Sequence, residues 1–170
     1  MIVGIRKMKR IKLDKIDRHI VSLLQAQGRM TNVDLAGKVG ISAPPCLRRV
    51  KALEEAGIIQ SYHANVNRSV FGYDVTIFAN IRLEKQAEED LLTFETRVQS
   101  MDRVRECHMI AGEVDFVLKI MAKSWDDYQD FRSKELTTAA NVSSVKSSMV
   151  MRTAKEEFGI PIEVEGSVAA

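Results

Sequence analysis

The stretch covering residues 40–60 combines adjacent prolines with a cluster of basic side chains. Two prolines stand just ahead of three basic residues: Pro44, Pro45, Arg48, Arg49 and Lys51. An arginine guanidinium can pair bidentately with guanine, and lysine or arginine can neutralise a phosphate. The residue types therefore suggest contact with a polyanion. The alternative is a basic helix face that is only solvated.

A helix that begins at the prolines would position this cluster. With Ser42 as N-cap, Pro44 and Pro45 fall in the first turn, where backbone N–H groups have no intrahelical partner and proline costs little. Cys46, Val50 and Leu53 then form an apolar stripe, and the basic residues lie mainly outside it. We therefore expect Ser42 and the prolines to shape the end of the helix that meets a ligand.

Two further helices precede this one. Apolar residues recur at helical spacing over residues 13–27, with Gly28 as the stop, and a short helix capped by Thr31 or Asn32 ends at Gly40. Three short helices with a glycine-containing turn indicate a helix-turn-helix. Ile58, Ile59 and Tyr62 suggest the short strand of a winged helix. The expected apolar faces of the first two helices are Leu13, Ile16, Ile20, Leu23 and Leu24, and Val33, Leu35, Ala36 and Val39.

The charge of the chain is divided between its two parts. Residues 1–68 hold 13 Lys and Arg against 5 Asp and Glu, a net charge of +8, whereas residues 69–170 hold 12 against 18, a net charge of −6. A basic front part fits a module that binds a polyanion. Residues 1–12 are interpreted as a basic arm that could add phosphate contacts, although a solvated tail is an equal alternative. Its candidate residues are Lys7, Lys9, Arg10 and Lys12.

The hydrophobic period changes after residue 73. The predicted order of elements from here on is β-α-β-β-α-β. It consists of an alternating strand at 75–83, a helix near 87–101, two strands around a turn at 111–113, a helix capped by Ser124 and a last strand near 143–152. We therefore predict an α+β chain. A winged helix-turn-helix (13–64) is followed by a linker (65–73), a ferredoxin-like domain (74–156) and a loose tail (157–170).

The second face of the predicted sheet is also partly apolar. Phe78 lies on the first strand, Val117 and Met121 lie on the third, and the last strand carries Met149, Val150 and Met151. Exposed apolar patches usually mark interfaces. We therefore predict that the domain dimerises sheet to sheet.

Four stretches resemble the Lrp/AsnC family of transcription regulators, most closely its leucine-responsive branch. They are "LDKIDRHIVSLLQAQGR", "NVDLAGKVGIS", "PCLRRVKALEEAGIIQSY" and "ECHMIAGEVDFVLKI", in order, within residues 11–155. The resemblance implies a winged helix-turn-helix followed by an amino-acid-sensing, ferredoxin-like domain of the RAM or ACT type. It also implies homodimers that assemble further, commonly into octamers, and a regulator that binds and bends double-stranded DNA.

The resemblance also implies where an amino-acid effector binds. The turn with Gly112, Glu113 and Asp115 would meet the effector, with glycine permitting a positive φ and the Asp115 carboxylate holding an α-ammonium group. A plain hairpin turn is the alternative. Val145 and Ser147 stand where the family has two threonines, and Asn141–Val142 replaces a Gly-Val step. These departures put the identity of the effector, and effector binding itself, into question.

Other kinds of chemistry find little support. Cys107 and His108 are strand neighbours that point to opposite faces, Cys46 is expected to be buried, and neither cysteine belongs to a CxxC pair. No nucleophile-base pair, phosphate loop or metal spacing is present, so we predict no enzyme, no metal and no cofactor beyond a possible amino-acid effector. Two alternatives stay open, an effector-independent architectural DNA-binding protein and an amino-acid-sensing module whose front part contacts protein. The sequence indicates a cytoplasmic, nucleoid-associated protein without a membrane segment.

Overall fold

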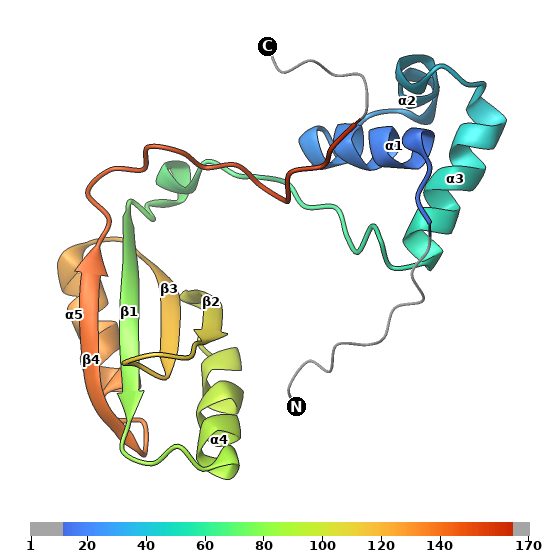
Figure 1. Ribbon diagram of the computed structural model, residues 1–170. Coiled ribbons are helices and arrows are strands. Elements are labelled where there is room, and N and C mark those ends of the chain that lie inside the picture. The colour runs from blue at the N-terminus through green and yellow to red at the C-terminus, as the bar shows by residue number, and fades with distance from the viewer. Residues whose placement is uncertain (1–11, 165–170) are drawn as a thin grey trace. The chain divides into compact units, whose positions relative to one another are not determined.

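A computed structural model describes residues 12–164 of the chain. These residues separate into two compact units (Figure 1). The helical unit comprises residues 12–65 together with 155–164, and the sheet unit comprises residues 66–154. Of the predicted arm, Lys7, Lys9 and Arg10 lie outside the described residues.

The helical unit contains the three predicted helices, α1 (Lys15–Ala26), α2 (Asn32–Val39) and α3 (Ala43–Glu55). Helix α2 ends at Gly40, which adopts the left-handed conformation with φ 74°, and the Ile41 N–H returns to the Ala36 carbonyl at 3.0 Å. The turn between α2 and α3 is therefore tight. The side chains of this core are Ile20, Leu24, Leu35, Ala36, Cys46 and Leu53.

Two expectations for this unit are wrong. Val33 is 70% exposed, because it lies two residues, or about 200° of helix rotation, from the buried Leu35. No strand forms at residues 58–62 within the described chain. The N–H groups of Ile58 and Ile59 both donate to the Leu53 carbonyl, which closes the end of α3 and leaves this segment outside any strand ladder.

The sheet unit has the predicted β-α-β-β-α-β order after a short 3-10 turn, η1 (Arg68–Phe71). Its elements are β1 (Val75–Leu83), α4 (Glu88–Gln99), β2 (Val104–Met109), β3 (Phe116–Ala122), α5 (Trp125–Phe131), the π-helical turn η2 (Arg132–Leu136) and β4 (Val142–Met149). The antiparallel strands lie in the order β2-β3-β1-β4, which is the ferredoxin-like arrangement. The fold class predicted from the sequence is confirmed.

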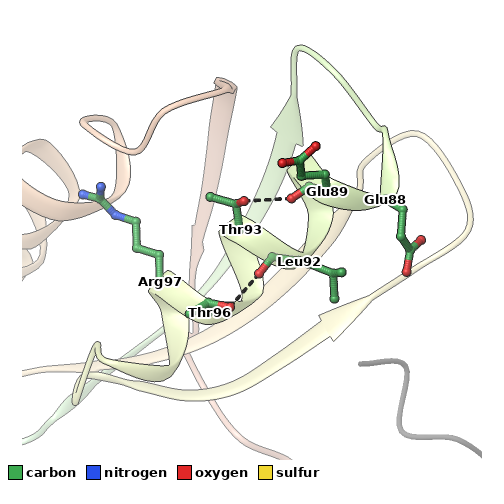
Figure 2. A pocket seen from close by; sticks show the side chains of 6 residues that line it. All are labelled: Glu88, Glu89, Leu92, Thr93, Thr96 and Arg97. Carbon is green, nitrogen blue, oxygen red and sulfur yellow. Dashed lines mark hydrogen bonds between the residues drawn. The ribbon is translucent and has the colours of Figure 1, made fainter.

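One face of the sheet forms the core with both helices. Alternate residues of β1 and β3 point into it, among them Ile77, Ile81 and Leu118, all fully buried. Phe94 of α4 and Tyr128 of α5 pack on the same cluster. Leu92 is only half buried and faces outward on α4, although it lies next to the core-facing Leu91 (Figure 2). Cys107 packs against this core while His108 bonds Glu106 at 3.4 Å, so the two point apart as predicted.

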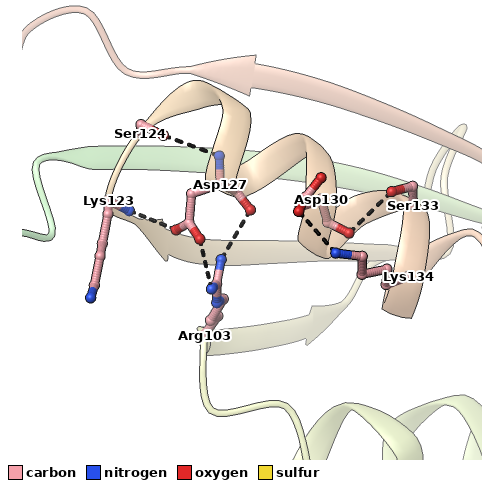
Figure 3. A network of polar contacts seen from close by, with 7 residues as sticks. All are labelled: Arg103, Lys123, Ser124, Asp127, Asp130, Ser133 and Lys134. Carbon is pink, nitrogen blue, oxygen red and sulfur yellow. Dashed lines mark hydrogen bonds and ion pairs between the residues drawn. The ribbon is translucent and has the colours of Figure 1, made fainter.

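A polar network at the start of α5 fixes this helix to the neighbouring strands (Figure 3). Ser124 caps the helix by accepting from the Asp127 N–H at 3.1 Å. The Asp127 carboxylate accepts the Lys123 N–H at 2.9 Å and pairs with the Arg103 guanidinium at 2.7 Å. The Lys123 N–H first, and then Arg103, lower the pKa of Asp127 below its usual 3.8.

Asp127→Asn should therefore flatten the acid side of the stability profile of the sheet unit. A carboxyl group whose pKa is lowered by folding stabilises the fold above its unfolded pKa and loses that contribution as the pH falls through the folded pKa. Thermal unfolding of wild type and variant, measured from neutral pH to below pH ~4, should show converging melting temperatures. A constant difference across this range would contradict the prediction.

Candidate DNA interface and effector turn

The start of α3 has an unusual pattern of hydrogen-bond donors. Ser42 is the N-cap residue, as predicted, but its side chain makes no capping bond. An N-cap side chain accepts from the backbone N–H of the second or third helical residue, and these are Pro44 and Pro45, which have none. The same prolines that start the helix therefore leave the Ser42 hydroxyl without a capping partner.

The predicted DNA-contacting residues differ in exposure. Ser42, Pro44, Arg48 and Lys51 are exposed, whereas Pro45 is half buried. Among the described hydrogen bonds and ion pairs, none is formed by the Arg48 or Lys51 side chains. Helix α3 therefore presents a free hydroxyl at its start and two free cations farther along, groups that can meet a phosphate or a base edge.

Arg49 differs from these residues because it has partners inside the helical unit. Its Nη1 lies 2.7 Å from Asp14 Oδ2 and 2.7 Å from Asp17 Oδ1. Asp14 and Asp17 also form the capping box of α1. The Asp17 N–H first, and also Arg49, lower the pKa of Asp14, and both carboxylates raise the pKa of Arg49. This pair ties α3 to the start of α1, a role that the sequence did not predict.

The predicted effector turn connects β2 to β3. Gly112 and Glu113 are exposed at its tip. Gly112 does not use the positive φ that glycine permits, since the glycines with positive φ in the described chain are elsewhere, and a Cβ at Gly112 would meet nothing within 4 Å. Asp115 Oδ2 accepts the Leu83 N–H of β1 at 2.7 Å, and the Asp115 N–H donates to the Ile81 carbonyl at 2.9 Å. Half of the Asp115 carboxylate is thus committed to the sheet.

Val145 and Ser147 lie on β4, opposite Ile81 and Ala79 of β1, and so belong to the helix-covered face. Val145 packs against the core, and the Ser147 hydroxyl bonds to the Tyr128 hydroxyl of α5. Phe116, next to Asp115, pairs with Ile81 from the other side. The structure therefore brings the turn and Val145 to the same end of the sheet, about 10 Å apart across β1, and no described contact joins them.

Asn141 accounts for one departure from the family pattern. It has φ 70°, a left-handed conformation that asparagine tolerates better than most residues. Its side-chain amide accepts the Lys85 N–H at 2.8 Å and donates to the Lys85 carbonyl at 2.7 Å. The backbone therefore keeps a conformation that glycine would also adopt. In addition, the asparagine side chain forms two hydrogen bonds to the loop after β1.

A shallow hollow on the outer face of α4 contains none of the predicted effector residues (Figure 2). Thr93 and Thr96 bond to carbonyls of their own helix, and Arg97 donates to the Glu135 carbonyl at 2.9 Å.

Among the described residues, no cluster of three or more histidine, cysteine or acidic side chains could hold a metal ion. Burial raises the pKa of Cys107 to about 11, so this thiol is a poor nucleophile. No described helix is long and apolar enough to cross a membrane.

Comparison with known proteins matches both units. Residues 13–60 match the winged helix-turn-helix DNA-binding model, and residues 76–160 match the Lrp/AsnC ligand-binding domain. The chain belongs to the Lrp/AsnC family. It is therefore a transcription regulator with a DNA-binding helix-turn-helix and a ligand-binding domain.

Individual relatives resemble the chain over most of its length. It is 45% identical over 153 residues to the leucine-responsive regulatory protein of Rhizobium meliloti, covering 90% of this chain and 98% of that protein. A transcriptional regulator from Neisseria meningitidis in complex with L-Met is 31% identical with a TM-score of 0.85, covering 88% and 97% of the two chains. A feast or famine regulatory protein of M. tuberculosis complexed with L-methionine is 31% identical with a TM-score of 0.78, covering 88% and 100%.

Because the Ser42 hydroxyl makes no capping bond, its removal should affect DNA binding but not the stability of the helical unit. Thr31, the N-cap of α2, accepts the Asp34 N–H at 3.2 Å, so Thr31→Ala should destabilise the helical unit by about 1 kcal/mol. Ser42→Ala should leave stability within ~0.5 kcal/mol while weakening DNA binding. Amide hydrogen exchange in α2 and α3 measures the first effect, and titration of promoter DNA measures the second. Equal destabilisation by the two substitutions would show that Ser42 caps α3 after all.

The two arginines should also behave differently. Arg49→Ala should lower the stability of the helical unit by about 1 kcal/mol, a value kept small because these carboxylates and the guanidinium are partly solvated. Arg48→Ala should leave stability unchanged and cost about 1–3 kcal/mol of DNA affinity. Thermal unfolding and DNA titration on the same two variants test this. A loss of stability in Arg48→Ala similar to that in Arg49→Ala would contradict the assignment.

Proposed function

We propose that this chain is a sequence-specific, homo-oligomeric regulator of amino-acid metabolism whose DNA binding is modulated by an amino acid. It would act in the cytoplasm on nucleoid DNA and perform no catalysis. The observation that carries the proposal is the solvent-facing side of α3. Its N-cap Ser42, and Arg48 and Lys51 farther along the helix, present polar groups without a described internal partner, in a chain whose second unit is a ligand-binding domain.

The DNA contact would follow the usual docking of a helix-turn-helix. The N-terminal end of α3 enters the major groove, where a guanidinium can pair with guanine. Pro44 and Pro45 stiffen that end and remove two N–H donors. Sequence discrimination would then depend on side chains, with Arg48 as the main base-reading candidate and Lys51 on phosphate. Arg49 would chiefly orient the helix through its bonds to α1.

The open face of the sheet supports assembly into dimers. Phe78 is 40% exposed on this face, and Val117 and Met121 of β3 lie beside it. Lys119, directly opposite Phe78 and between Val117 and Met121, is paired with Glu106 at 2.8 Å, and Lys146 lies opposite Asn80. Apolar side chains exposed among polar ones in this way can mark an interface. We propose that two copies pair through this face and that dimers assemble further, to an octamer.

The turn at 110–115 supports an amino-acid effector. Gly112 needs no special φ and has empty space around its Cα, so its small size has no explanation within the chain. Close approach of another molecule provides one. Asp115 Oδ2 is taken by the Leu83 N–H, which leaves the second oxygen to accept from an α-ammonium group. Leucine and methionine are the first effectors to try, because related regulators are leucine-responsive or were solved with L-Met.

One observation favours the alternative of an effector-independent architectural protein. The Ser147 hydroxyl is bonded to the Tyr128 hydroxyl, and Val145 has no hydroxyl and packs on the core. Neither side chain is therefore available to an effector without a change at β4. An oligomer that binds DNA equally with and without every amino acid would select this alternative.

Asp115→Asn gives a sharp test of sensing. The amide oxygen can still accept the Leu83 N–H, while the charge that would hold an α-ammonium group is lost. Mass by light scattering and affinity for promoter DNA should change with L-leucine or L-methionine in wild type, by about fivefold or more in affinity, and not in Asp115→Asn. Asp102→Asn, an exposed carboxylate outside the turn, serves as the control. A response that persists in Asp115→Asn would remove this residue from the effector site.

A further inference from the structure

The segment after β4, predicted from the sequence to be a loose tail, contacts the helical unit. Residues 155–164 belong to the helical unit, and the chain lies beside α1 there (red segment, Figure 1). Residues 165–170 lie outside the described residues. The contact with α1 involves one exposed side chain on the helix, Gln25, and the backbone of Ile160.

Gln25 holds both backbone polar groups of Ile160. Its Nε2 donates to the Ile160 carbonyl at 2.7 Å, and its Oε1 accepts the Ile160 N–H at 3.1 Å. A side-chain amide has one donor and one acceptor in a plane, as a peptide group has, so it can pair with an extended chain as a neighbouring strand would. The contact selects an extended backbone rather than a particular side chain.

Gly159 shows that the fit is close. Its φ of 88° lies in the region that side chains rarely adopt. A Cβ at this position would overlap Cγ, Cδ and Oε1 of Gln25. Glycine is therefore favoured by the backbone conformation, and any larger residue would also have to push the Gln25 side chain out of its present position. Two independent features of one residue thus match the same contact.

The segment is also prepared for an extended conformation. Pro161 restricts φ and disfavours a helical conformation at Ile160 before it, which lowers the entropy lost on docking. Ile162 and Val164 are half buried, and Glu163 between them is exposed, as expected for an alternating extended chain. Phe158 and Ile160 point their side chains largely into solvent. The segment is therefore held by hydrogen bonds to its backbone and not by burial of these two apolar side chains.

We propose that the C-terminal end of α1 carries a docking site for extended peptide backbone, and that its occupant is the segment 158–164 of this chain. Gln25 is the recognition residue, and Gly159 is the residue that lets the backbone reach it. The docked segment follows β4 along the chain. The helical and sheet units are therefore joined twice, once through the linker after Asn65 and once through the residues between β4 and the docked segment.

This second connection links β4 to helix α1 through the chain after Met149 and the two hydrogen bonds between Gln25 and Ile160. Any change at Val145 or Ser147 that moves the end of β4 acts on a segment whose far end is held by Gln25. The docking itself does not depend on the identity of an effector or on DNA binding. It can therefore be tested even if the proposed function proves wrong.

Amide hydrogen exchange on the intact full chain tests the docking. In wild type, the segment around Ile160 should exchange about fivefold or more slowly than the same sequence in a free peptide, the protection expected from one or two solvent-accessible hydrogen bonds. Gln25→Ala should abolish the protection, and Gln27→Ala at the C-cap of the same helix should keep it. Gln25 is exposed, so its loss should not unfold the unit, which exchange in α1 verifies in the same data.

Gly159→Ala provides the second arm. It should release the segment as fully as Gln25→Ala does, and the double variant should release it no further, because both substitutions remove the same contact. Free-peptide exchange rates in wild type would overturn the proposal. Unchanged protection in Gln25→Ala would do the same, since it would show that other contacts hold the segment.

Discussion

The arrangement of the DNA-binding helices depends on the contact between Arg49 and the capping box of α1. Exposed ion pairs generally contribute little, because two long side chains must be ordered to form them. Here Asp14 and Asp17 already hold each other's backbone N–H groups, so one side of the pair is ordered by the helix start itself. Only Arg49 loses additional freedom. A single guanidinium thereby links the beginning of α1 to the middle of the helix that faces DNA.

The basic residues of α3 therefore have different roles. Arg49 forms ion pairs within the helical unit, whereas Arg48 and Lys51 are directed to solvent. The prolines further reduce the options at the start of the helix, because they remove the N–H groups that would otherwise bind phosphate or a serine cap. In the sheet unit a similar division holds between a core face covered by α4 and α5 and an open face that presents Phe78.

Much of this structure could be predicted from the sequence, because it is encoded in local periods. The strand from Val75 to Leu83 and the helix with Ile20 and Leu24 could be predicted from the spacing of apolar residues along the chain alone. The errors share a different cause. Whether Ile58 and Ile59 form a strand depends on whether a partner strand exists, and here their N–H groups close α3 instead.

The candidate sites were predictable in position but less so in geometry. Residue types suggested Arg49 as a DNA contact, but its pairing with Asp14 and Asp17 across two helices has no local signature. Gly112 permits a positive φ but does not adopt one, whereas Asn141 is the residue that has one in that part of the sheet. Gln25 and Ile160 are separated by almost the whole chain, so no local pattern could indicate that they pair.

The strand order has a consequence for the chain as it is made. β1 lies inside the sheet, between β3 and β4, but β4 is the last strand to be synthesised. Until then one edge of β1 is open, and this strand carries the alternating apolar residues Ile77, Ala79 and Ile81. Unprotected edges of this kind are sites of aggregation. A nascent or truncated chain that stops before β4 therefore exposes an unpaired, apolar strand edge, which is covered only when β4 pairs with β1.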